Sequence, residues 1–110
     1  MKRSIKSGQR SVRQLHFTCS ADGLTLSGLD ALKVSMADTG TGIKTITLNE
    51  AFSDANYSVQ VTSGTALTVA NAIITDSSSF VVDSITASTG AAVDSVVHVC
   101  VTGSDVSDRY

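Results

Sequence analysis

Short segments in which apolar and polar residues alternate recur along the whole chain. The clearest are residues 57–62 (YSVQVT) and 92–102 (AVDSVVHVCVT). A period of two places successive side chains on opposite faces of a β-strand, and the Cβ-branched Val and Thr fit such a pleated surface well. Similar segments, separated by turns rich in Gly, Ser and Asp, lie at residues 14–20, 29–36, 43–48, 67–75 and 80–85. About seven short strands without a helical stretch predict an all-β fold, an antiparallel β-sandwich or barrel.

The alternation also predicts which side chains form the core. We expect the following to be largely buried: Phe17, Leu32, Val34, Val59, Val61, Val81, Val97, Val99 and Val101. His98 falls on the opposite face of its strand and is expected to be exposed or in contact with a partner. Cys19 and Cys100 lie in the first and last strand segments, so a disulfide is possible if those strands are neighbours. A protein made in a cytoplasm keeps such cysteines reduced, and we predict two free thiols within the core.

The charge is divided unevenly between the start of the chain and the rest. Five of the eight basic residues fall in the first thirteen positions, with no acid among them: Lys2, Arg3, Lys6, Arg10 and Arg13. Residues 14–110 hold three basic residues and all ten acidic ones, a formal charge of −7. We therefore predict an extended basic N-terminal arm (1–13), a β domain (14–103) and a polar C-terminal tail (104–110). The five basic side chains of the arm are the predicted partner-binding residues, and an acidic protein surface is their expected partner.

Other partners fit the composition less well. A nucleic-acid-binding body is expected to present a basic face or stacking aromatic side chains, whereas this body is acidic and poor in aromatics, so nucleic acid is an unlikely partner. No segment approaches the roughly 18 apolar residues of a membrane span. The basic N-terminus is not followed by the apolar region of a secretory signal, so we expect no membrane association and no secretion.

Several short motifs suggest chemistry but lack the context that it requires. Residues 38–40 (DTG) match the triplet of aspartic proteases, but the flap and hinge segments that accompany it are missing, and a strand-to-strand turn explains the triplet better. Residues 40–45 (GTGIKT) lack the Gly-Lys pair and the following helix of a phosphate loop. His16 and His98 have no carboxylates at metal-ligand spacing, and no serine stands in a nucleophile elbow. We predict no enzymatic activity, no metal site and no cofactor.

The second part of the chain resembles small structural proteins of tailed-bacteriophage virions. The resemblance lies in residues 37–63 (ADTGTGIKTITLNEAFSDANYSVQVTS) and 78–103 (SSFVVDSITASTGAAVDSVVHVCVTG). Their common pattern is a Gly-rich turn, a T-x-T-L strand, F-x-x-x-x-Y-x-V-x-V-T, F-x-V and a final strand of alternating valines that ends at Gly. Proteins of this kind serve as capsid decoration (cement) proteins or as modules of head and tail fibres.

The resemblance implies a capsid decoration protein in the virion, assembled in the host cytoplasm. Such a protein bridges and stabilises neighbouring capsid subunits, here through the arm and the edge strands. Its expected partners are the major capsid protein, neighbouring copies of itself, or both, and we expect a homo-oligomer. The alternative is a receptor- or glycan-binding fibre module, whose contact surface would be the loops at residues 21–28, 49–56 and 63–68.

Overall fold

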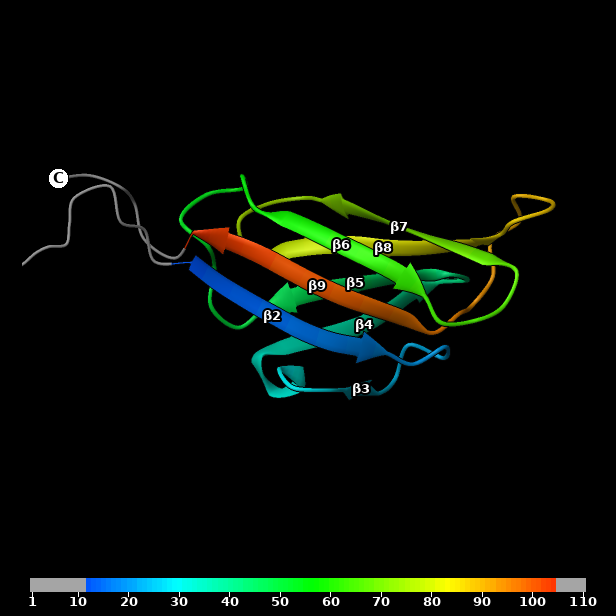
Figure 1. The fold of residues 1–110 in the computed structure, drawn as a ribbon, viewed down its shortest axis with the longest axis horizontal. Coiled ribbons are helices and arrows are strands. Elements are labelled where there is room, and N and C mark those ends of the chain that lie inside the picture. The colour runs from blue at the N-terminus through cyan, green and yellow to red at the C-terminus, as the bar shows by residue number, and fades with distance from the viewer. Residues whose placement is uncertain (1–11, 105–110) are drawn as a thin grey trace, which may run out of the picture.

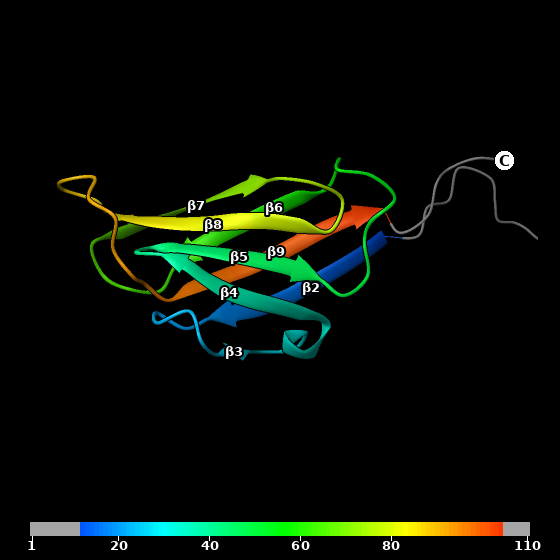
Figure 2. The same ribbon diagram turned by 180° about the vertical axis from the view of Figure 1, so that it is seen from behind.

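The protein is a sandwich of two antiparallel β-sheets, as a computed structural model describes for residues 12–104 (Figures 1 and 2). The prediction of an all-β antiparallel sandwich is confirmed. The sequence-based predictions for Lys2, Arg3, Lys6 and Arg10 and for residues 105–110 fall outside the described residues.

The first sheet joins the two ends of the described chain. Its strand order is β3-β2-β9-β6, formed by β2 (Val12–Cys19), β3 (Leu26–Ser27), β6 (Ser58–Ser63) and β9 (Val97–Ser104). β2 pairs with β9 over its full length, from Val12 opposite Ser104 to Cys19 opposite Val97. The first and last strands are therefore neighbours at the centre of this sheet.

The second sheet is continuous except for one bulge. Its strand order is β4-β5-β8-β7, formed by β4 (Val34–Gly40), β5 (Ile43–Leu48), β7 (Thr68–Ile74) and β8 (Ser79–Thr86). β4 and β5 form a hairpin whose register shifts between Asp38 and Gly40. Gly42 in its turn has φ +70°, and a Cβ there would lie 2.7 Å from the carbonyl oxygen of Ser84. Only glycine combines that backbone conformation with so close a neighbour.

The core lies between the sheets and follows the predicted alternation in most strands. Its buried apolar residues come from both sheets and one loop: Leu15, Phe17, Cys19, Val34, Ile46, Leu48, Phe52, Tyr57, Phe80, Val82, Val97, Val99 and Val101. Five of the predicted core residues are among them, namely Phe17, Val34, Val97, Val99 and Val101. Val59 and Val61 are half-buried on β6 and pack against this cluster.

The prediction that Leu32 is buried is wrong, because its side chain is 93% exposed. Residues Ala31–Lys33 form a single 3₁₀ turn (η1) instead of the start of a strand. The carboxylate of Asp30 accepts a hydrogen bond from the backbone N–H of His16, which ties this segment to β2. Alternation with Val34 therefore does not extend back to Leu32, and the turn rotates that side chain into solvent.

The burial predicted for Val81 is shifted by one residue. Phe80, Val82 and Ser84 are the buried members of β8, while Val81 is half-buried on the outer face. Both valines suit either face, and the large Phe80 side chain takes the inward position. The even-numbered residues of β8 therefore face the core, and the odd-numbered ones face outward.

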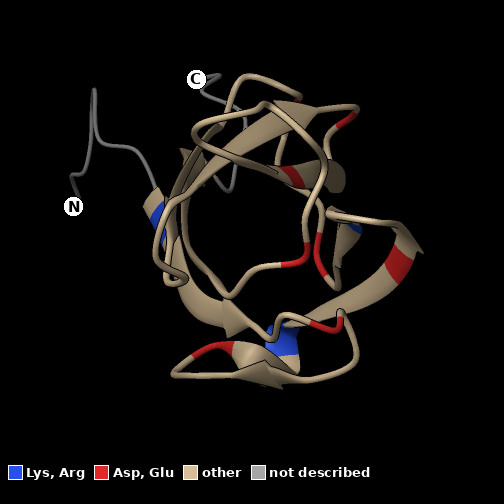
Figure 3. Ribbon diagram, turned by 90° about the vertical axis from the view of Figure 1, so that its right-hand side faces the viewer, with Lys and Arg blue, Asp and Glu red and all other residues tan. Residues whose placement is uncertain are grey.

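The two strand ends at the termini also differ from the predicted boundaries. β2 begins at Val12, so Val12 and Arg13, which we assigned to the arm, belong to the sheet. β9 extends to Ser104. Residues 12–104 hold eight acidic and three basic residues, a formal charge of −5. Figure 3, which looks along the length of the sandwich, shows acidic positions on several of its sides.

Candidate functional site

Arg13, one of the predicted partner-binding residues, is bound to its own domain. Its guanidinium donates hydrogen bonds to the carbonyl oxygens of Glu50 (2.9 Å) and Ala51 (3.0 Å) and lies 4.3 Å from the centre of the Phe52 ring. It also approaches the Glu50 carboxylate at 3.8 Å. These contacts fasten the loop after β5 to the first sheet, and they engage Arg13 within the fold.

The Phe52 ring links Arg13 to the aromatic side chains of the core. It stacks on Tyr57 with ring centroids 4.8 Å apart, and Tyr57 contacts the edge of Phe80. The Tyr57 hydroxyl donates a hydrogen bond to the backbone, where the carbonyl oxygens of Asp76 and Ser79 lie at 2.8 and 3.0 Å. Burial raises the pKa of this hydroxyl to about 12. A Cβ at Gly103 would lie 2.7 Å from Tyr57 and 2.8 Å from Phe52, so this stack requires glycine there. These residues stabilise the fold and carry no exposed chemistry.

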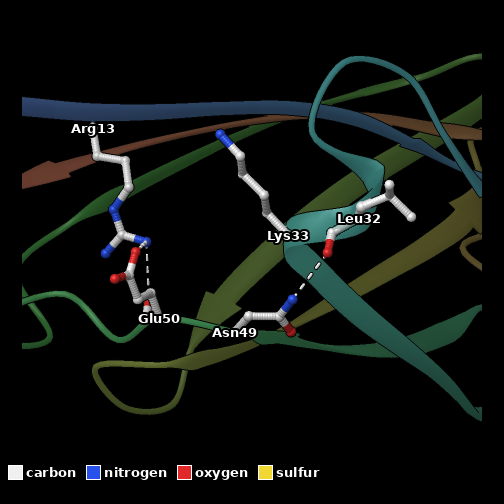
Figure 4. A pocket seen from close by; sticks show the side chains of 5 residues that line it. All are labelled: Arg13, Leu32, Lys33, Asn49 and Glu50. Carbon is white, nitrogen blue, oxygen red and sulfur yellow. Dashed lines mark hydrogen bonds and ion pairs between the residues drawn. The ribbon is translucent and has the colours of Figure 1, made fainter.

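A hollow of about 220 Å³ lies beside this loop (Figure 4). Its wall consists of Arg13, Leu32, Lys33, Asn49 and Glu50. Arg13 is engaged with Glu50, Lys33 with Asp30 at 3.3 Å, and the Asn49 amide donates to the carbonyl of Leu32. Because each of these polar groups already has a partner within the fold, the hollow offers little to a ligand beyond the exposed Leu32.

The three loops predicted as a glycan-contact surface do not lie together. Residues 21–28 and 63–68 are at the end of the sandwich where β9 begins, since Cys19 pairs with Val97 and Gly64 N–H donates to the carbonyl of Val96. Residues 49–56 are at the opposite end, where Ser53 N–H donates to Ser104. A single contact surface built from all three loops is therefore excluded.

The outer face of the first sheet carries His16, His98 and Cys100. His98 is exposed, as predicted, and its Nδ1 lies 3.0 Å from the Thr18 hydroxyl. His16 Nε2 lies 3.9 Å from the Cys100 sulfur. Across residues 12–104, no three His, Cys, Asp or Glu side chains are arranged to hold a metal ion.

The two cysteines occupy different environments, so the prediction that both lie in the core is wrong for one of them. Both are free thiols. Cys19 faces the interior opposite Val97, and burial raises the pKa of its thiol to about 11. Cys100 is half-buried on the outer face opposite His16. Side chains that point to opposite faces of one sheet cannot form a disulfide without backbone movement.

The interior contains one charged side chain that sequence reasoning did not place. Lys44 on β5 points inward beside Ile46 and Leu48 and is only 2% exposed. The carbonyl of Ser95, at 3.1 Å, is the only hydrogen-bond acceptor for its ammonium among residues 12–104. The Ser95 hydroxyl is itself buried without a partner in that range. No strand alternation could identify this site, because residues 43–48 carry apolar side chains at both odd and even positions.

The outer face of the second sheet carries several partly exposed aliphatic side chains. Its members come from three adjacent strands and lie in register: Ile43 on β5, Val81 and Ile85 on β8, and Val69 and Ile73 on β7. Val69 and Ile73 are 50% and 51% exposed. Asp83 lies at the centre of this face, opposite Ile43 on one side and Asn71 on the other. We call these six residues, Ile43, Val69, Ile73, Val81, Asp83 and Ile85, the outer apolar face.

The DTG triplet lies at the hairpin between β4 and β5. Asp38 accepts a hydrogen bond from the backbone N–H of Gly40 at 3.3 Å, across the bulge at the end of β4. Its cross-strand neighbour is Lys44. The interpretation of residues 38–40 as the turn itself is wrong, because they are the last three residues of β4, at its bulge, and the turn is formed by residues 41–42.

In comparisons with known proteins, no family model, no curated protein and no solved structure matches the chain. Within residues 12–104, no helix reaches the length and apolarity needed to cross a bilayer.

Proposed function

We propose that this protein is a non-enzymatic structural component of a tailed-phage virion, a capsid decoration protein that bridges neighbouring subunits. The observation that carries the proposal is the outer apolar face. Its partly exposed aliphatic side chains flank Asp83 on three adjacent strands, and exposed apolar surface of this kind marks surfaces that contact other proteins. A small domain that exposes it is suited to work as part of an assembly.

The charge distribution supports the same proposal. Residues 1–11 contribute Lys2, Arg3, Lys6 and Arg10 and no acid, whereas residues 12–104 carry a net charge of −5. The basic segment of one subunit and the acidic body of the next attract each other, which favours contacts between adjacent subunits. The acidic body also repels nucleic acid. Many weak contacts of this kind, repeated over a symmetric shell, act together through multivalency.

The fibre-module alternative receives less support, because its three loops lie at two ends of the sandwich. It would require a contact surface made by one end alone.

The test compares binding to undecorated capsids of the phage that encodes the chain. The full-length protein should bind, and binding should weaken as salt rises, because exposed charge pairs are screened. The matched variant deletes residues 2–11 and keeps Val12 and Arg13, which belong to β2. It should remain folded by circular dichroism and bind less tightly. Equal binding by both forms would remove the role of the N-terminal segment, and arm-dependent binding to naked DNA but not to capsids would favour a nucleic-acid partner.

A further inference from the structure

Asp83 differs from every other acidic residue that the structure describes. The other seven carboxylates accept a hydrogen bond or make an ion pair within residues 12–104: Asp22, Asp30, Asp38, Glu50, Asp54, Asp76 and Asp94. The Asp83 side chain has neither, although it is half-buried. A partly desolvated carboxylate without a partner is unfavourable, and a cation that reaches it gains a charge-assisted hydrogen bond.

The surroundings of Asp83 define what kind of segment could supply that cation. Ile43 lies opposite it on β5 and Asn71 lies opposite it on β7. Val81 and Ile85 are two positions away on β8, and Val69 and Ile73 are its diagonal neighbours on β7. A complementary partner therefore needs one basic group flanked by apolar side chains. Direct face-to-face packing of two copies is disfavoured, because it would bring two Asp83 carboxylates together in an apolar contact.

The N-terminal segment of the chain has this chemistry. Among residues 1–11, Arg3 and Ile5 are two positions apart, so in an extended segment they project to the same side. Fully extended, eleven residues span about 36 Å, which exceeds the roughly 26 Å length of an eight-residue strand such as β8. The segment is thus long enough to cover the whole outer apolar face.

We propose that residues 1–11 of one copy bind the outer apolar face of a neighbouring copy, with a basic side chain paired to Asp83. A neighbour is the better source than the same chain. Val12 lies in the first sheet, so its own segment would have to turn back and pass around the edge of the sandwich, past two sheets about 10 Å apart, before it reached the outer face of the second sheet. That path uses much of its length, whereas a neighbour's segment can lie along the full strand.

The contact joins two different surfaces, the segment of one copy and the face of the next. Such a head-to-tail interface closes into a ring or continues as an array. This inference rests on the proposed structural function and specifies which surface makes contacts between copies.

Sedimentation velocity over a range of protein concentrations tests the proposal on the full-length chain. The wild type should self-associate, more weakly at high salt. Asp83→Lys should weaken association by about tenfold or more, because it places a like charge opposite the basic segment. The control, Asp54→Lys, makes the same charge change in an exposed loop outside the face, and its association should stay within about twofold of the wild type. Deleting residues 2–11 should weaken association as much as Asp83→Lys does, and the combined variant should lose nothing further, as expected of two halves of one contact.

One measurement and one further variant guard against loss of folding as the cause. Circular dichroism should show each variant to be folded, which is expected since Asp83 lies on the outer face. Ile73→Thr, which keeps a β-branched side chain, should also weaken association, by several-fold. A wild type that stays monomeric at all concentrations, or an Asp83→Lys variant that associates like the wild type, overturns the inference. If deletion of residues 2–11 abolishes capsid binding but leaves self-association unchanged, the proposed function stands and this inference fails.

Discussion

Replacing Lys44 by Met should stabilise the protein. Lys44 holds an ammonium between the sheets with a single described acceptor, the Ser95 carbonyl at 3.1 Å, and with no ion pair among residues 12–104. Met has a similar length and flexibility and fills irregular core space without a charge. The substitution therefore tests whether this buried cation is a cost to the fold.

The magnitude follows from two opposing terms. Moving an ammonium out of water costs several kcal/mol even after relaxation, on the order of 4 kcal/mol, and Met removes that cost. Loss of the charge-assisted hydrogen bond, with the Ser95 carbonyl left unpaired, costs about 2 kcal/mol. We expect a net gain of about 2 kcal/mol in the free energy of unfolding.

Urea unfolding at pH 7, followed by circular dichroism, measures this difference. The midpoint should rise while the m-value stays constant, since the surface exposed on unfolding is unchanged. The control is Lys33→Met, which removes a solvent-exposed lysine paired with Asp30 and should change stability by less than about 1 kcal/mol. If Lys44→Met instead destabilises the protein by 1 kcal/mol or more, the ammonium has partners that offset its burial, and the reasoning is wrong.

Three further predictions concern close packing, thiol reactivity and the dependence of stability on pH. Gly103→Ala should destabilise the protein by roughly 1–3 kcal/mol in the same urea assay, because the added Cβ overlaps the Phe52–Tyr57 stack; an unchanged midpoint would mean that the stack can shift. In native protein at pH 8, a thiol reagent should modify half-buried Cys100 first and buried Cys19 only slowly, whereas equal rates would contradict the burial difference. The pKa of Cys19 is raised to about 11 in the folded protein, above the thiol's unfolded value of about 8.5. The free energy of unfolding should therefore be at its full value below about pH 8.5 and fall as pH rises toward 11, because the unfolded state releases the thiol proton first. Urea unfolding between pH 8 and 11 would detect this fall.

Local alternation in the sequence was enough to predict the fold class and most of the strands. Residues 59–61 and 97–101 carry valine at every second position. β6 lies within one residue of the predicted range 57–62, whereas β9 begins five residues after the start of the predicted range 92–102 and ends two residues beyond it. The faces of β9 were predicted correctly, with Val97, Val99 and Val101 inward and His98 outward. This worked because only one face of that strand is apolar, so a single register buries it.

The candidate surfaces could not be predicted in the same way. The charge split is visible in the sequence, but the engagement of Arg13 by the loop at residues 50–52 is a contact between segments almost forty residues apart. The outer apolar face likewise joins residues from three strands, and Asp83 is central only because β8 lies between β5 and β7.

The order of the amino acids is sufficient to predict that the chain forms short antiparallel strands and that its start is basic and its body acidic. Which face of residues 43–48 and 80–85 is buried, and hence that Lys44 is inside and Asp83 outside, depends on how the strands pair and pack. Both segments carry apolar side chains on both faces, so their own pattern is satisfied either way. The choice is made by pairing and packing with other strands, since Phe80 and Ile46 are neighbours in the sheet and fill the same core.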